Sequence, residues 1–126
     1  MNGDSALVDQ FILEQFDTVP HLEALLLVWN RRPKAWSREE MAQSLYVPAD
    51  LAARVLRDLL QRDLLEETDT GEYRYKSHSA EKDALISQVN ETYRRELIRV
   101  SRMIHAKAPS AVRDFAQAFR FTKEKD

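Results

Sequence analysis

A chain of 126 residues, 44% of them apolar and 32% charged, is long enough for one compact domain and an extension. Two glycines are too few for a Gly-rich loop that cradles phosphates, and the lack of cysteine excludes disulfides and thiolate metal sites. The net charge of −2 divides into −7 for residues 1–72 (14 acids, 7 bases) and +5 for residues 73–126 (7 acids, 12 bases), which indicates either surfaces with different roles or solvated faces that merely differ.

Two amphipathic helices are predicted in the first 32 residues. Apolar residues recur at helical spacing after Ser5, which favours a short helix that ends near Phe16 and belongs to an N-terminal segment, residues 1–18. Pro20 then opens a second helix, because proline is well tolerated in the first turn. Pro33 prevents its continuation. The expected buried stripe of this second helix is Leu22, Leu25, Leu26 and Trp29.

A helix-turn-helix is predicted between residues 37 and 62. Ser37 and Glu40 form a capping box, in which each side chain accepts a hydrogen bond from the other residue's backbone amide, so a helix begins there. The Val47-Pro48 pair ends that helix, and the next one runs from Pro48 to about Arg62. Two short helices joined by a tight turn define the motif. The longer one is expected to bury Leu51, Val55, Leu56, Leu59 and Leu60.

A β-hairpin is predicted directly after this pair of helices. The segments 64–68 and 72–76 flank a three-residue loop in which Gly71 supplies the positive φ that such loops commonly require. Two strands alone are only marginally stable, so the hairpin must lie against the helices as a wing. Tyr73 and Tyr75 face one side of the returning strand, and Arg74 and Lys76 face the other.

The C-terminal half is expected to be helical. Residues 79 to about 107 contain no glycine or proline, which predicts one rod of about 43 Å with a single apolar stripe. A further helix is predicted from Pro109. The stripe buries itself either against a second copy, giving a homodimer, or against the chain's own first two helices; the homodimer is the preferred interpretation. The candidate dimer or partner contacts are Ile86, Val89, Tyr93, Leu97, Val100, Ile104, Phe115 and Phe119.

The string SREEMAQSLYVPADLAARVLRDLLQRDLL, from Ser37 to Leu65, resembles the winged helix-turn-helix domains of small bacterial transcription regulators. The resemblance extends over roughly 55 residues of the chain. It implies a mainly α fold with a small β-hairpin, in which residues 19–78 form the winged unit and residues 79–126 a helical extension with a long helix. In similar regulators, helices outside the winged unit form the dimer interface.

The resemblance also implies a DNA-binding surface. The helix at residues 48–62 would be the recognition helix, which enters the major groove, and the wing would touch backbone phosphates. Carried over by position, the candidate DNA contacts are Arg38, Arg54, Arg57, Gln61, Arg74 and Lys76.

Other residues favour a protein-interaction module that does not bind DNA. The first turn of the predicted recognition helix is rich in alanine, which carries no hydrogen-bonding information for base edges. Four carboxylates surround the wing tip, where duplex DNA, with about one negative charge per 1.7 Å, would repel them. They are Glu66, Glu67, Asp69 and Glu72. A regulator is the leading hypothesis, and a docking module with a protein partner is the alternative.

Catalysis, cofactors and membrane insertion are not expected. His21, His78 and His105 are scattered without metal-ligand spacing and are interpreted as surface or helix-end residues. The sequence has no Gly-x-Ser-x-Gly elbow and no cysteine nucleophile, so an enzyme is not predicted. No apolar run approaches the length of a membrane span. A cytoplasmic protein without metal or cofactor is therefore predicted, which agrees with the absence of cysteine.

Overall fold

The computed structural model describes residues 2–107, which form six helices and one two-stranded hairpin. In chain order these are α1 (Asn2–Gln15), α2 (Val19–Asn30), α3 (Arg38–Leu45), α4 (Ala49–Gln61), β1 (Leu65–Glu67), β2 (Tyr73–Tyr75), α5 (Ala80–Arg95) and α6 (Leu97–Lys107). The predicted fold class, mainly α with a small hairpin, is confirmed. The helix expected after Pro109, with Phe115 and Phe119, lies outside the described residues.

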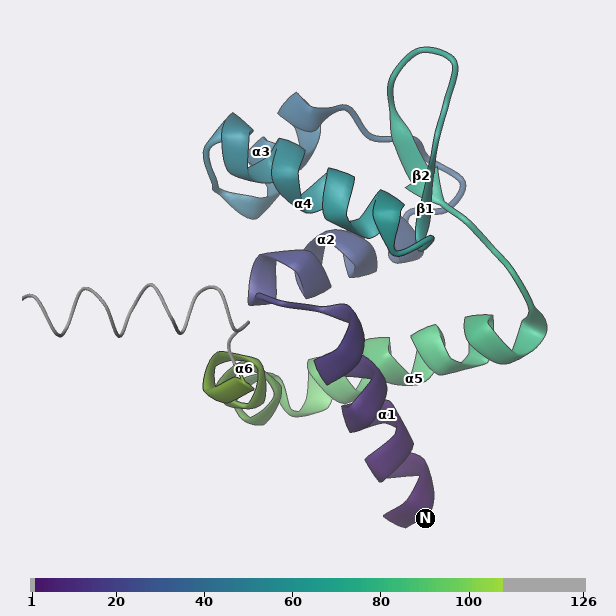
Figure 1. Cartoon of the computed structure of the whole chain (residues 1–126), viewed down its shortest axis with the longest axis vertical. Helices are drawn as coiled ribbons and strands as arrows, with labels where there is room; N and C mark the ends of the chain where they lie inside the picture. Colours follow the sequence, from purple (N-terminus) through teal and green to yellow (C-terminus); the bar gives the residue numbers. More distant parts are fainter. Residues whose placement is uncertain (1, 108–126) are drawn as a thin grey trace, which may run out of the picture.

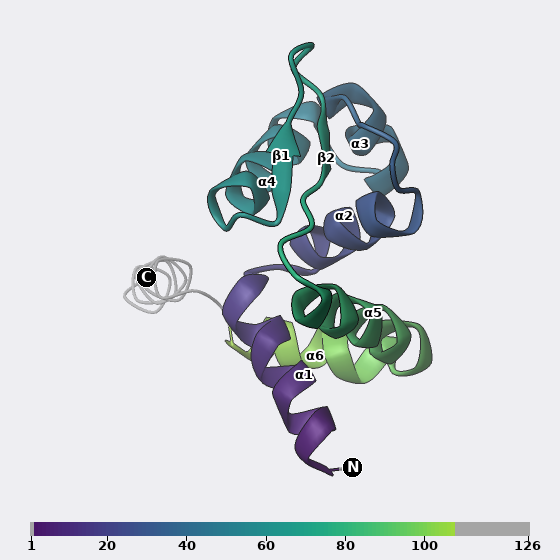
Figure 2. The same ribbon diagram turned by 90° about the vertical axis from the view of Figure 1, so that its right-hand side faces the viewer.

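The elements form two layers, which Figures 1 and 2 show from two sides. The winged unit, made of α2, α3, α4 and the hairpin, occupies one end of the molecule. Helices α1, α5 and α6 pack against one another at the other end. Within the winged unit, α2 is the helix that packs against this second layer, mainly through α6. The N-terminal and C-terminal segments, far apart in sequence, therefore build one helical layer that supports the winged unit.

A single apolar core joins the two layers. Phe16 and Leu22 are fully buried at the corner between α1 and α2, and Leu25 and Val28 extend the core along α2. Trp29 packs edge-on against Tyr75 of the wing, with 5.0 Å between the ring centroids. Burial of these side chains provides most of the driving force for folding, at about 1.5–3 kcal/mol for each fully buried aliphatic or aromatic residue.

Side chains cap the starts of α2 and α5, whereas α1 begins at Asn2 and not near Ser5 as predicted. Thr18 caps α2 by accepting a hydrogen bond from the His21 backbone amide, and Pro20 lies in the first turn. Ser79 caps α5 by accepting from the Lys82 amide at 3.1 Å. Each cap satisfies one of the backbone donors that a helix start otherwise leaves without a partner.

The predicted single rod between residues 79 and 107 is wrong. Helix α5 ends at Arg95, Glu96 leaves the helical conformation with φ −130° and ψ 47°, and α6 begins at Leu97. Figure 1 shows α5 along its length and α6 end-on, so the two helices run in different directions. The break lets α6 pack against α1, where Arg99 binds Asp9 with N–O distances of 2.9 and 3.2 Å.

Most of the apolar side chains predicted to form one stripe along residues 86–104 are buried within the chain and do not form an outward face. They were expected to face a second copy, but five of the six within residues 2–107 are buried in the chain's own core. Packing within one chain, the alternative considered for this stripe, accounts for them. Leu97 alone among the six remains half-exposed, at 48%. The five buried residues are Ile86, Val89, Tyr93, Val100 and Ile104.

No helix within residues 2–107 combines the length and apolar character that a membrane crossing needs.

Candidate nucleic-acid interface

Helix α3 is positioned by the capping box at its start. The Ser37 hydroxyl accepts from the Glu40 amide at 3.1 Å, and the Glu40 carboxylate accepts from the Ser37 amide at 3.0 Å. The hydrogen bond from the Ser37 amide, together with one from the Lys34 side-chain ammonium, lowers the pKa of Glu40 below its usual range. Tyr46 then ends the helix in the left-handed conformation, with φ 58° and ψ 46°. This turn directs the chain from α3 into α4.

Helix α4 divides into a buried and an exposed face. Ala52, Val55, Leu56 and Leu59 are fully buried against the core. The other face carries the exposed side chains Asp50, Arg54, Arg57 and Gln61. Leu51 and Leu60, also predicted to be buried, are only partly covered. One face of α4 therefore carries a stripe of polar side chains that is open to solvent.

Two polar contacts anchor α4 to the corner between α1 and α2. His21 is 5% exposed; its Nε2 lies 2.8 Å from Asp58 Oδ2 and its Nδ1 lies 2.6 Å from Thr18 Oγ1. At the end of α4, Arg62 donates to the Glu14 carbonyl at 2.8 Å and lies 3.4 Å from the Asp17 carboxylate. These contacts link the orientation of α4 to that of the helical layer.

The interpretation of His21 as a surface or helix-end residue is therefore wrong in its first part. His21 does lie at the start of α2, but its ring is buried between α2 and α4. Its partner Asp58 is 37 residues away, so no local pattern pairs them. The burial of His21 could have been predicted from its position one residue before Leu22, at the edge of the helix stripe that faces the core.

The wing is a hairpin with a third backbone segment at its side. Strand β1 pairs antiparallel with β2 in the register Leu65–Tyr75, Glu66–Arg74 and Glu67–Tyr73. Trp36, before α3, joins β2 through two backbone hydrogen bonds with Tyr73, of 2.7 and 2.8 Å. Gly71 has φ 82°, as predicted for the loop. The wing is thus tied to the start of the helix-turn-helix.

Both cations of the wing are engaged in ion pairs. Arg74 Nε lies 2.6 Å from Glu66 Oε2, directly across the hairpin. Lys76 Nζ lies 2.9 Å from Asp63 Oδ1, and this contact lowers the pKa of Asp63 below its usual range. His78 Nε2 also lies 3.0 Å from the Asp63 carboxylate. These pairs occupy the two wing residues that were predicted to contact phosphates.

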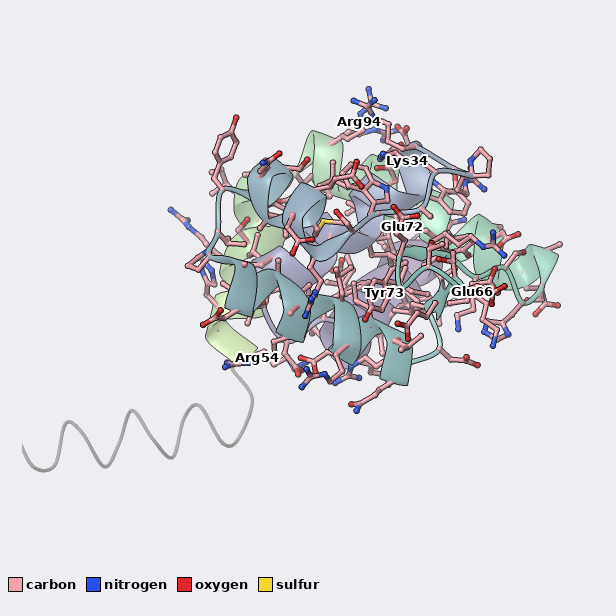
Figure 3. The ribbon with its side chains drawn as sticks, turned by 90° about the horizontal axis from the view of Figure 1, so that it is seen from above. Lys34, Arg54, Glu66, Glu72, Tyr73 and Arg94 are labelled. Atoms are coloured by element: carbon pink, nitrogen blue, oxygen red, sulfur yellow. The ribbon has the colours of Figure 1, made fainter. Side chains whose placement is uncertain are left out.

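The cations of α3 and α4 differ from those of the wing. Among the side chains of residues 5–107, those of Arg38, Arg54 and Arg57 form neither an ion pair nor a hydrogen bond. Figure 3 shows Arg54 pointing away from the body, on the side opposite Arg94, while Glu66 and Glu72 lie on the wing. The candidate interface thus contains free cations along α4 and neutralised cations on the wing.

No metal site is evident in the described part of the chain. Residues 2–107 contain no group of three or more histidine, aspartate and glutamate side chains that could hold an ion.

These elements define a winged helix-turn-helix fold like that of small bacterial transcription regulators: α2, α3 and α4 with a hairpin wing, flanked by helices from both chain ends. A MarR family protein from Bacillus stearothermophilus has this fold with a TM-score of 0.50 and 16% identity, over 96% of this chain and 86% of that one. MepR, a transcription regulator of the Staphylococcus aureus multidrug efflux pump MepA, gives a TM-score of 0.49 at 12% identity, over 96% and 90% of the two chains. No family model matches the sequence, and no curated protein matches it.

Proposed function

We propose that this chain is a winged-helix transcription regulator that binds duplex DNA through α4. The observation that supports this most directly is the exposed stripe of α4, where Arg54 and Arg57 have no anionic partner among the side chains of residues 5–107. Arg57 lies three residues after Arg54 and Gln61 four residues after Arg57, so one face of the helix carries all three. Arginine and glutamine are side chains that read base edges in the major groove.

The anchoring of α4 also supports this role. A recognition helix has to be held rigidly, because base contacts fail when side chains are displaced by about 1 Å. Asp58 and Arg62 lie on or at the end of α4 and bind the α1–α2 corner, while Val55, Leu56 and Leu59 pack into the core. Arg38, at the start of α3, is exposed and is proposed as a phosphate contact.

The test is a fluorescence anisotropy titration with a random-sequence duplex at two salt concentrations, about 50 and about 200 mM. Binding is expected to weaken steeply with salt. The double variant Arg54→Ala/Arg57→Ala is expected to bind more weakly. The slope of log affinity against log salt concentration is expected to fall by about one for each of these arginines that contacts a phosphate. A duplex pool selected for binding would then show whether Arg54 and Arg57 also set sequence preference.

The matched control is Arg94→Ala/Arg95→Ala, which removes the same charge from exposed positions of α5. Arg94 points away on the opposite side from Arg54 in Figure 3. This control is expected to retain the wild-type slope. An equal loss in both double variants would contradict recognition by α4. No binding of wild-type protein at about 50 mM salt would contradict DNA binding and favour the protein-interaction module.

We also propose that the chain self-associates as a homodimer. Large apolar side chains remain exposed on the helical layer: Leu7 at 61%, Leu97 at 48% and Ile98 at 62%. Leu97 and Ile98 are neighbours at the start of α6, and adjacent exposed apolar residues are candidates for an interface. Light scattering should give the mass of two chains at micromolar concentration, and Leu97→Glu/Ile98→Glu should give one. A monomeric wild-type protein would contradict this. Phe115 and Phe119 remain predicted contacts outside the described residues.

A further inference from the structure

The wing carries a net negative charge, and both of its cations are paired with its own carboxylates. Residues 63–76 contain five carboxylates and two cations, a net charge of −3. The carboxylates are Asp63, Glu66, Glu67, Asp69 and Glu72, and the cations are Arg74 and Lys76. The exposed stripe of α4, by contrast, carries two arginines and one aspartate. Two neighbouring surfaces of the winged unit thus have opposite electrostatic character.

The backbone places each wing cation beside a carboxylate. Glu66 and Arg74 are cross-strand partners in the hairpin register, where side chains opposite each other interact directly. Lys76 donates its backbone amide to the Leu64 carbonyl at 3.1 Å, which holds it beside the corner residue Asp63. Asp63 occupies a left-handed conformation at that corner, with φ 66°. The hairpin and its corner therefore bring the residues of both pairs within reach of each other.

If a wing cation moves to a DNA phosphate, its carboxylate partner is left unpaired beside the DNA. Exposed ion pairs are weak, so a phosphate could draw Arg74 away from Glu66. The freed carboxylate of Glu66 would then face the same phosphates without a partner, and repulsion would offset the new contact. The same holds for Lys76 and Asp63. Neutralising a phosphate with either cation therefore gains little net affinity.

We propose that Glu66 and Asp63 are affinity-limiting residues: their carboxylates pair with Arg74 and Lys76 and offset what either cation would gain from a phosphate, so the wing adds little to DNA affinity. This inference rests on the proposed DNA binding through α4. A wing that adds little sequence-independent affinity leaves a larger share of the binding to α4, where base edges are read. The weak contact of the wing thereby favours discrimination between sequences over tight binding to any duplex.

The test is a gain of function. Glu66→Gln removes the charge and keeps the size of the side chain, and Asp63→Asn keeps a residue that tolerates the left-handed conformation. Each variant is expected to bind a random duplex about fivefold more tightly at about 0.1 M salt and to steepen the salt slope by about one, as for one added phosphate contact. Thermal melting of each variant checks that the fold is retained.

A double-mutant cycle separates the ion pair from the general change in charge. Arg74→Ala leaves the Glu66 carboxylate without a partner, so in the wild-type background it is expected to weaken binding slightly without reducing the salt slope. In the Glu66→Gln background it is expected to remove the whole gain. The matched control is Glu67→Gln, one residue along the same strand, which faces Tyr73 across the hairpin instead of a cation. It is expected to raise affinity less and to leave the salt slope unchanged.

The outcomes also distinguish this inference from the proposed function. Equal effects of Glu66→Gln and Glu67→Gln, or a salt slope reduced by about one in Arg74→Ala alone, would overturn the inference while leaving DNA binding by α4 intact. If wild-type protein does not bind, the proposed function fails. Arg74-dependent binding gained by Glu66→Gln would still support the inference in that case, and its absence would overturn it.

Discussion

His21 Nε2 lies 2.8 Å from Asp58 Oδ2, and this contact joins the start of α2 to the middle of α4 across 37 residues of sequence. The ring is buried, with its other nitrogen 2.6 Å from Thr18 Oγ1, so both nitrogens have partners. Buried polar groups cost free energy unless they are paired, so each member of this chain of contacts depends on the others. The helix proposed to enter DNA is therefore held by a partly buried polar contact at the edge of the core.

Removing the Asp58 carboxylate should destabilise the protein. Asp58→Ala leaves the buried Nε2 of His21 without its partner, which should lower the free energy of unfolding by about 1–3 kcal/mol. Asp58→Asn keeps a side-chain oxygen at that position and should retain most of the stability. Urea denaturation measures both. The control Glu67→Ala, at an exposed position of β1, should remain within about 0.5 kcal/mol of wild type. Equal stability of Asp58→Ala and Glu67→Ala would show that the contact contributes nothing.

The capping box of α3 should also contribute measurably. Ser37→Ala removes the acceptor for the Glu40 amide, and the loss of such a cap typically costs about 1 kcal/mol. Ser44→Ala, within the same helix, replaces an exposed serine with a better helix former and should not destabilise the protein. Comparison of the two urea midpoints tests the capping role, and a loss as large in Ser44→Ala would argue against it.

Local patterns in the sequence were sufficient to predict the winged unit. The Ser37–Glu40 spacing identified the start of α3, Gly71 identified the loop, and the 3–4 spacing of Val55, Leu56 and Leu59 identified the buried face of α4. Each of these signals depends on residues within one turn or one hairpin. Interactions of that range are set by backbone geometry and short periodicities, which a single sequence displays directly.

Long-range contacts account for what could not be predicted. The break at Glu96 has no glycine or proline; it occurs where α6 turns to pack on α1, and Arg99 contacts Asp9 across 90 residues. The ion pairs of the wing are an intermediate case. Strands flanking residues 69–71 symmetrically place Glu66 opposite Arg74, so that pair could have been inferred from the loop alone, whereas the Asp63–Lys76 pair needs the corner geometry.

The amide pair between α2 and α5 should couple the two layers energetically. Asn30 Nδ2 donates to Asn90 Oδ1 at 3.1 Å, and Asn90 Nδ2 donates to Asn30 Oδ1 at 3.0 Å. Either single substitution leaves one amide without its partner. The double variant Asn30→Ala/Asn90→Ala should therefore lose less free energy of unfolding than the sum of the two single losses, with a coupling of about 1 kcal/mol. A double-mutant cycle by urea denaturation measures this coupling. Strict additivity would show that the two amides act independently.

Stability should fall in acid, partly through Asp83. Tyr75 and Ser77 donate hydrogen bonds to its carboxylate, each at 2.7 Å, and these bonds, that of Tyr75 first, lower the pKa of Asp83 below its ordinary value of 3.8. A folded-state pKa below the unfolded value gives stability that is present above pH 3.8 and is lost as the pH falls through the folded value. Tyr75→Phe should therefore lower the Tm at about pH 6 and reduce the further fall in Tm between about pH 4 and pH 2. An unchanged acid-induced fall in Tyr75→Phe would contradict this.

Tyr46 is a site where substitution should stabilise the protein. Its φ of 58° places a side chain in the left-handed region, which costs about 1–2 kcal/mol for a residue other than glycine. The ring is 94% exposed, so its removal loses almost no packing. Tyr46→Gly should therefore raise the free energy of unfolding by about 1 kcal/mol, since glycine adopts this conformation freely and its greater unfolded-state entropy offsets only part of the gain. Tyr46→Ala is the matched control: it removes the same ring but keeps the Cβ atom and so the conformational cost. A urea midpoint that rises for Tyr46→Gly and not for Tyr46→Ala would attribute the effect to the backbone, whereas equal midpoints for the two variants would show that the left-handed turn carries no strain.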